Sequence, residues 1–166
     1  KSLGNGLSVP AVLAENSAWV VRYALGSVQY RSMLEWSDQT LTEAQSAYDR
    51  VSNFIERAGA AVGGQPSREE IVSVSADELP ADFVAAMNDD INVSGASAAI
   101  FTAIRSGNTL LSKLADRVDS DVAKDEVRAV LVNVRAMLDT LGLDPLAEPW
   151  VSEGAAGCAA GAGADS

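Results

Sequence analysis

Residues 119–145 read DSDVAKDEVRAVLVNVRAMLDTLGLDP, and this stretch decides the fold class. Apolar side chains recur in it at intervals of three and four residues, as one face of an α-helix requires. They are Val127, Val130, Leu131, Val134, Leu138 and Leu141. Asp119 or Ser120 can cap the start of this helix, and Gly142 with Pro145 ends it. An amphipathic helix must bury its apolar face, so further helices are expected to cover it.

Other segments of the chain predict such helices. Ser8 and Pro10 start a short helix, Ser17 caps a second one with Val20, Tyr23 and Ala24 on one face, and Ser37 or Asp38 caps a long third one. The predicted helices cover residues 9–15, 17–27, 38–57, 81–88 and 94–118.

Two segments lack a helical period. Residues 28–37, VQYRSMLEWS, alternate in character and predict a short edge strand. Residues 58–80 contain AGAAVGGQPS and then REEIVSVSADELP, which predict a mobile loop. The fold class is therefore mainly α: a small α/β piece in residues 1–38, an antiparallel helical bundle in 39–150, and a Gly/Ala-rich linker in 151–166 that leads to a missing C-terminal domain.

The composition excludes several classes of enzyme. The chain has 166 residues, no histidine and a single cysteine, Cys158, so it can form neither a Ser-His-Asp nor a Cys-His site, nor a zinc-hydrolase centre. A lone cysteine cannot form an internal disulfide, which fits a reducing compartment. No apolar run is long enough to span a membrane, and the first ten residues do not form a signal peptide. We expect a cytoplasmic, monomeric protein without membrane contact or metal ligands.

The charge is strongly negative and unevenly placed. The net charge is −11, and residues 1–57 carry five basic and six acidic side chains, whereas residues 58–166 carry seven and seventeen. Because net negative charge opposes binding to a polyanion, contacts with nucleic acid or phosphate are expected in the first third of the chain.

Three sets of polar or aromatic residues allow a structural interpretation. Asp89 and Asp90 precede a helix start and are expected to cap it rather than hold a metal ion. Asn108 is expected to be a hydrogen-bonded or exposed amide. Trp19, Trp36 and Trp150 are expected to be packing residues.

Residues 1–5, KSLGN, carry the most suggestive chemistry. A lysine ammonium such as that of Lys1 can follow a phosphate group as its charge moves, and the hydroxyl of Ser2 can add a hydrogen bond. Gly4 permits a sharp turn with close backbone approach. Taken alone, the five residues are better explained as a frayed chain end.

The longer context resembles cysteinyl-tRNA synthetases, which are class I aminoacyl-tRNA synthetases. The resemblance covers residues 1–150 and is most specific in KSLGN, in YRSMLEWS at residues 30–37 and in NDDIN at residues 88–92. In this family a Lys-Met-Ser-Lys-Ser loop is commonly followed by Leu-Gly-Asn, so Lys1 and Ser2 would be its last two residues. Gln29 and Asn88 depart from the family's usual histidine and aspartate.

The resemblance implies an activity and its substrates. Such enzymes activate L-cysteine with ATP and transfer it to tRNA(Cys), and Lys1, with Ser2, would bind the ATP phosphates, Lys1 being the catalytic residue through charge stabilisation. The family's nucleotide motif and zinc ligands would lie outside this chain. We therefore expect a C-terminal fragment that runs from the signature loop through the DALR helical domain and is inactive alone.

The resemblance also implies two parts that face tRNA. Residues 6–38 would match the stem-contact fold, in which Arg22, Tyr30 and Arg31 are candidate tRNA contacts, and residues 39–150 would match the DALR bundle, which orients the tRNA. The alternative is that Tyr30 packs in the core and the arginines pair with Glu35 or Asp38.

Two other functions stay open at this point. The first is the mycothiol-pathway ligase that joins cysteine to an amino sugar, which shares the loop but uses no tRNA. The second is a non-catalytic helical module whose acidic face binds a protein partner. For the tRNA-dependent interpretation, we expect weak and strongly salt-dependent RNA binding by the fragment.

Overall fold

The computed structural model describes residues 9–27, 37–115 and 121–151. Within these ranges the chain forms seven α-helices and one 3₁₀ helix, and no strand. The mainly α fold class is thus confirmed. The strand predicted at residues 28–37 falls, except for Ser37, outside the described residues, as do the cap predicted at Asp119 or Ser120 and the linker thiol Cys158.

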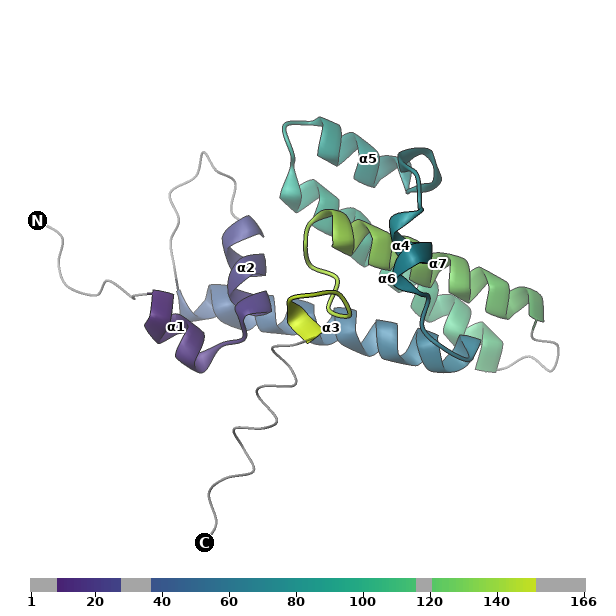
Figure 1. Ribbon diagram of the computed structural model, residues 1–166, viewed down its shortest axis with the longest axis horizontal. Coiled ribbons are helices and arrows are strands. Elements are labelled where there is room, and N and C mark those ends of the chain that lie inside the picture. The colour runs from purple at the N-terminus through teal and green to yellow at the C-terminus, as the bar shows by residue number, and fades with distance from the viewer. Residues whose placement is uncertain (1–8, 28–36, 116–120, 152–166) are drawn as a thin grey trace, which may run out of the picture.

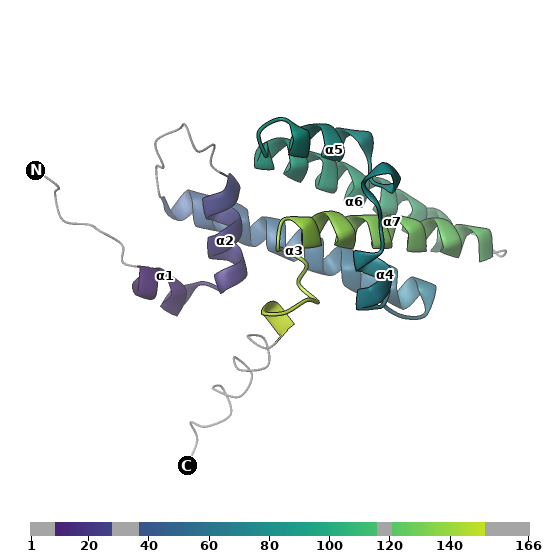
Figure 2. The ribbon, with the colours of Figure 1, turned by 45° about the horizontal axis from the view of Figure 1, so that its top comes forward.

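The centre of the molecule is a bundle of four helices (Figures 1 and 2). Helices α6 (Val93–Ala115) and α7 (Asp121–Thr140) form an antiparallel pair, and α5 (Ala81–Asn88) packs on α6. The long helix α3 (Asp38–Val62) lies along both α6 and α7. Helices α5, α6 and α7 alternate in direction, as expected for an antiparallel bundle (Figures 1 and 2).

Helices α3 and α6 run in the same direction and approach closely. The guanidinium of Arg50 lies 5.0 Å from the ring centroid of Phe101, and seven residues further along both helices Arg57 donates to Asn108. Between these contacts Gly107 lies against Phe54, whose Cε2 atom would be 2.5 Å from a Cβ placed on the glycine. Only a glycine at this position allows the Phe54 ring to fill the space between the helices.

The core is built around α7, as the opening stretch predicted. Of its six periodic positions, Val127, Leu131, Val134 and Leu138 are buried, and the other two are half-buried. Phe54 of α3 and Phe83 of α5 are buried in the same core cluster. Burial of one such apolar side chain contributes about 1.5–3 kcal/mol to folding.

The first helices share this core. Helix α1 (Val9–Glu15) leads into α2 (Ala18–Ser27), whose start is capped as predicted, since the Ser17 hydroxyl accepts a hydrogen bond from the amide of Val20 at 3.3 Å. Trp19 is 2% exposed and its Nε1 atom donates to the carbonyl of Leu143 at 2.8 Å. The Trp19 ring stacks on Tyr23 at 5.3 Å, which confirms its packing role. A domain boundary at residue 38 stays a prediction.

Helix α3 is longer than predicted. Ser37 caps it, its hydroxyl accepting from the amide of Thr40 at 3.3 Å, but the helix continues past residue 57 to Gly63, whose φ of 84° ends it. Ala58 is fully buried and Val62 packs against the core. These tertiary contacts hold a segment in helix whose small residues alone suggest a linker.

The prediction of a loop over residues 58–80 is also wrong. It contains α4 (Arg68–Val72) and a 3₁₀ helix, η1 (Ala76–Glu78). Helix α4 is tied to α7 by two ion pairs, Arg128 with Glu70 at 2.8 Å and Arg68 with Asp139, and Ile71 between them is 2% exposed. A helix of five residues is too short to show a period, and its stability comes from these contacts with α7.

The 3₁₀ helix has its own polar cap. The amide and hydroxyl of Ser75 donate to Glu78 Oε2 at 2.8 and 2.6 Å. These hydrogen bonds hold the pKa of the Glu78 carboxyl below its ordinary value. The cap therefore favours η1 when Glu78 is ionised, and this contribution is lost as the pH falls through the lowered pKa.

The turn between α5 and α6 differs from the prediction that Asp89 and Asp90 cap the next helix. Asp89 is the C-cap residue of α5, and the side chain that caps α6 is that of Asn92, whose Oδ1 accepts from the amide of Gly95 at 2.9 Å. Asp90 and Ile91 between them have φ values of 51° and 53°. Asn92 is better placed than either aspartate because it stands three residues before the amide that it caps.

Candidate functional site

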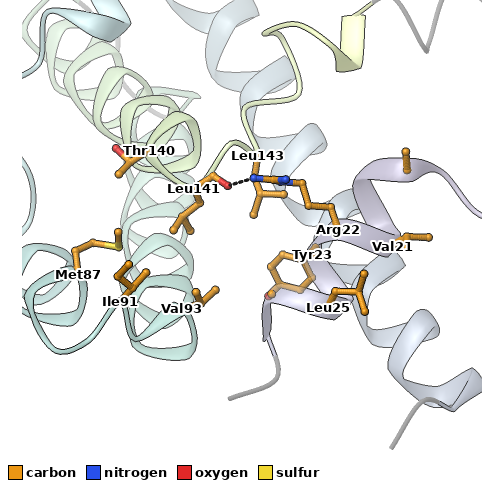
Figure 3. Close-up of a pocket in the computed structure, with 12 residues that line it drawn as sticks. Val21, Arg22, Tyr23, Leu25, Met87, Ile91, Val93, Thr140, Leu141 and Leu143 are labelled. Carbon is orange, nitrogen blue, oxygen red and sulfur yellow. Dashed lines mark hydrogen bonds between the residues drawn. The ribbon is translucent and has the colours of Figure 1, made fainter. Parts of the chain in front are cut away.

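A groove separates α2 from the ends of α5, α6 and α7, and we name it the α2 groove (Figure 3). Its volume is about 710 Å³. Figure 3 shows Tyr23 and Leu25 of α2 on one side, facing Met87, Ile91 and Val93 on the other. Its lining consists of Ala18, Val21, Arg22, Tyr23, Leu25, Gly26, Met87, Ile91, Val93, Thr140, Leu141 and Leu143.

Arg22 bridges the two sides of the α2 groove. Its Nη2 atom donates to the carbonyl of Leu141 at 3.3 Å (Figure 3). At the far end, the Ser94 hydroxyl donates to the carbonyl of Ser27 at 3.1 Å. Two polar bridges thus fix the distance between α2 and the bundle, while the space between them is lined by apolar side chains.

The lining suits binding rather than catalysis. Arg22 and Tyr23 are its titratable residues, and it includes no carboxylate. General acid–base catalysis most often uses a histidine or a carboxylate, and the lining contains neither. Across the described residues, no three Asp, Glu or Cys side chains gather as a metal site would require.

The structure describes one of the five predicted site residues. Arg22 is exposed and hydrogen-bonded to a backbone carbonyl, and no carboxylate of the described part of the chain pairs with it. Lys1, Ser2, Tyr30 and Arg31 lie outside the described residues. The proposed phosphate and tRNA contacts of these four stay predictions.

Other predicted roles can be compared directly. Asn108 is half-buried and accepts a hydrogen bond from Arg57 Nη1 at 3.2 Å, which confirms the hydrogen-bonded amide. Trp150 packs against the core and its Nε1 atom donates to the carbonyl of Gly142 at 3.2 Å, which confirms a structural role. Trp36 lies outside the described residues.

Sequence reasoning missed a buried ion pair. Arg135 is 3% exposed and Asp144 is 1% exposed. The guanidinium donates to the carboxylate through Nη2 at 2.9 Å and through Nε at 3.2 Å, and its Nη1 atom donates to the carbonyl of Pro66 at 2.9 Å. Arg135 stands four residues after Leu131 on the apolar face of α7, and a charge at such a position is the signal that could have revealed the pair.

Gly142 lies against Arg22, which lines the α2 groove, and its replacement is a testable change. Its φ is 66°, and a Cβ atom there would lie 2.7 Å from Arg22 Nη2. We expect Gly142→Ala to lower the free energy of unfolding by about 1–2 kcal/mol, because the alanine needs a left-handed conformation and displaces Arg22. Urea denaturation of the wild type and the variant measures this.

The matched control is Gly26→Ala. Gly26 lines the same groove, but a Cβ there would have its nearest neighbour at 3.9 Å, and the residue lies inside α2. This change should be neutral or stabilising, since alanine is the better helix former. Equal losses of stability in both variants would contradict the assigned role of Gly142.

Residues 82–145 match a known domain family, the DALR domain. That range covers α5, α6, α7 and the Gly142 turn. No solved structure matches the chain. No helix in the described ranges combines the length and the apolar composition needed to cross a membrane.

The curated relatives are longer proteins that bear one name. A protein of Bifidobacterium longum named cysteine–tRNA ligase is 84% identical over 156 residues, which cover 94% of this chain and 29% of the relative. Proteins of the same name from Beutenbergia cavernae and Streptomyces avermitilis are 47% and 40% identical, and the match covers 31% and 30% of their lengths. The chain spans less than a third of these relatives. Over 94% of its length the chain is thus similar to part of a protein named cysteine–tRNA ligase, and its residues 82–145 match the DALR domain.

Proposed function

We propose that this chain is the tRNA-orienting part of an enzyme that activates L-cysteine with ATP and joins it to tRNA(Cys). The observation that carries the proposal is the 84% identity, over 156 residues, to a protein named cysteine–tRNA ligase. At this level of identity a change in substrate class is hard to accommodate, and the match extends well beyond the DALR domain to 94% of the chain.

The proposal assigns roles to three parts of the chain. Residues 1–38 would hold the end of the ATP-phosphate loop and the stem-contact fold, residues 39–150 the DALR bundle, and residues 151–166 a linker. Lys1 and Ser2 would contact the ATP phosphates, and ATP would supply the adenylyl group that activates the cysteine carboxylate, with pyrophosphate as the leaving group. Zinc ligands would lie elsewhere in the protein.

The architecture supports a role in positioning. Trp19 joins α2 to the Leu143 backbone, and the buried pair of Arg135 and Asp144 joins α7 to the segments on both sides of it. A bundle held together in this way can keep a bound tRNA at a fixed angle to a catalytic domain attached through residues 1–38. We propose Arg22 of α2, together with Tyr30 and Arg31, as tRNA contacts, with the protein acting in the cytoplasm as a monomer.

The proposed function is tested with the complete gene product that contains residues 1–166. Purified protein, ATP and radiolabelled cysteine are incubated with a tRNA(Cys) transcript and, separately, with a non-cognate transcript. We expect cysteinylation of tRNA(Cys) alone, and none when residues 1–166 are used by themselves. If tRNA(Cys) is not charged but pyrophosphate is released when an amino sugar is added, the protein is the mycothiol-type ligase instead. Absence of both activities would favour a non-catalytic module.

A further inference from the structure

The acidic chain has one face whose cations are not neutralised. In the described part of the molecule, four cations pair with carboxylates: Arg68, Lys124, Arg128 and Arg135. Arg50 and Arg57 of α3 and Arg105 of α6 are exposed and have no described carboxylate within ion-pair distance. These three arginines, with Phe101, Asn53 and Asn108 between them, form what we name the α3–α6 face.

Helix α6 contributes no negative charge to this face. It has 23 residues with Arg105 and Lys113 among them but no aspartate or glutamate, although the chain carries 23 acidic residues. Its outward positions include the hydroxyl residues Thr102, Thr109 and Ser112. The paired cations, in contrast, lie on α4 and α7. The cations of the α3–α6 face are therefore unpaired within the described part of the chain, although α3 also carries carboxylates at Asp49 and Glu56, which precede Arg50 and Arg57 in the chain.

The three arginines are held in place by neighbours that leave their charge available. Arg50 donates through Nε to the carbonyl of Ser46 at 3.0 Å, and its guanidinium lies over the Phe101 ring at 5.0 Å. Arg57 donates to Asn108 Oδ1 at 3.2 Å, and Arg105 donates to the hydroxyl of Thr102 at 3.0 Å. Side chains that are already ordered lose less entropy when they bind a ligand.

A shallow depression of about 350 Å³ lies among these side chains. Arg50 and Arg105 line it together with Phe101, Asn53 and Asn108. One carboxylate, that of Asp49, also lines it, and its Oδ1 accepts a hydrogen bond from Gln45 Nε2 at 2.8 Å. With two arginines in the depression and a third bonded to Asn108, positive charge outweighs this carboxylate.

We propose that the α3–α6 face binds the phosphate backbone of tRNA through Arg50, Arg57 and Arg105. The proposal rests on the proposed function for the identity of the RNA. Guanidinium groups bind phosphate oxygens in a two-pronged geometry, and planar arginine is suited to this contact better than lysine. The face adds a second RNA contact within the bundle to the contacts already proposed. Such contacts position the RNA and do not read its sequence.

The test measures binding of a fluorescein-labelled tRNA(Cys) transcript to residues 1–166 by anisotropy, at a series of salt concentrations. The triple variant R50Q/R57Q/R105Q should bind about 10- to 100-fold more weakly near 0.1 M salt, and the slope of log K against log salt should fall by about 2. The lysine variant R50K/R57K/R105K should restore most of the slope, because it keeps the three charges.

A second triple variant controls for net charge. R68Q/K124Q/R128Q removes the same number of cations, but from positions that pair with Asp139, Asp121 and Glu70. It should change tRNA affinity by less than about threefold, because charges that are already paired contribute little to polyanion binding. Circular dichroism of every variant verifies that it is folded.

The outcomes separate this proposal from the proposed function. If the complete protein charges tRNA(Cys) and R50Q/R57Q/R105Q leaves both the affinity and the KM for tRNA unchanged, the α3–α6 face is not an RNA contact and the function stands. If the two triple variants weaken binding equally, the effect is one of net charge and the face is again excluded. If the complete protein does not charge tRNA, the function fails, and the anisotropy comparison still tests the face.

Discussion

Replacing Asp144 by alanine is expected to lower the free energy of unfolding by about 3–5 kcal/mol. The change leaves the Arg135 guanidinium buried at 3% exposure without its carboxylate partner. It also removes the acceptor for the amide of Leu146, which donates to Asp144 Oδ1 at 3.2 Å. A loss of this size is a large part of the 5–15 kcal/mol that stabilises an ordinary domain. Urea denaturation followed by circular dichroism measures it.

A double variant separates the charge from the space that it fills. Arg135→Met with Asp144→Leu removes both charges and keeps apolar volume, so it should be clearly more stable than Asp144→Ala alone. The carbonyl of Pro66 then loses its donor, which should keep the double variant below the wild type. An Asp144→Ala variant that loses less than about 1 kcal/mol would show that the pair is not a main anchor of the segment after α7.

The same ion pair shows where sequence reasoning reached its limit. The helical fold followed from the spacing of Val127, Leu131, Val134 and Leu138, because apolar periodicity records which face of a helix is buried. Periodicity does not record polar contacts between segments distant in the chain. Arg135 donates to the carbonyl of Pro66, which lies 69 residues away, and no local pattern in residues 58–80 indicates this contact.

The error at α4 has the same physical cause. Its five residues, REEIV, form a single turn and a half whose stability depends on Arg128, on Asp139 and on burial of Ile71. The extension of α3 through Ala58 to Val62 likewise depends on packing against the core. Local sequence predicted those elements that are long and periodic, and missed the ones that only the finished tertiary structure stabilises.

For the candidate site, too, local sequence predicted some features and missed those that depend on tertiary contacts. The family was indicated by short stretches such as KSLGN and NDDIN, and the comparisons with curated relatives support it. The arginines of the α3–α6 face gave no such signal. Arg50 and Arg57 are seven residues apart on α3, and Arg105 lies on α6. The three form a cluster only because the two helices run in the same direction. The expectation that phosphate contacts lie in the first third of the chain included Arg50 and Arg57 by position but did not single them out.

Charge placement connects the two proposed RNA contacts. The excess negative charge gathers after residue 57, yet many of the cations in that region are paired with carboxylates on α4 and α7. Such pairing removes both partners from the field that an approaching RNA meets. Among the described residues, the exposed cations without a carboxylate partner are Arg22 beside the α2 groove, the arginines of the α3–α6 face and Lys113 of α6. An acidic domain can therefore present a cationic path for RNA without a basic overall charge.

Replacing Lys1 by alanine in the complete gene product is expected to lower the rate of ATP–pyrophosphate exchange in the presence of cysteine by about 10²–10³-fold, or about 3–4 kcal/mol in transition-state free energy. The reason is that the proposed role of the Lys1 ammonium is to stabilise charge that develops at the phosphates as the cysteine carboxylate attacks. The affinity for tRNA(Cys) should stay unchanged, because the tRNA contacts proposed here involve other residues.

The control for the Lys1 variant is Lys124→Ala, which removes a lysine on α7 that lies 4.0 Å from Asp121 and far along the chain from the proposed phosphate loop. Its exchange rate should remain within about twofold of the wild type, since a surface ion pair of this kind contributes little. A Lys1→Ala enzyme with the wild-type exchange rate would remove the proposed phosphate contact. A loss of tRNA affinity with normal exchange would instead place Lys1 against the RNA. Pyrophosphate exchange is the decisive measurement because it proceeds without tRNA, so it reports on Lys1 independently of both proposed RNA-binding surfaces.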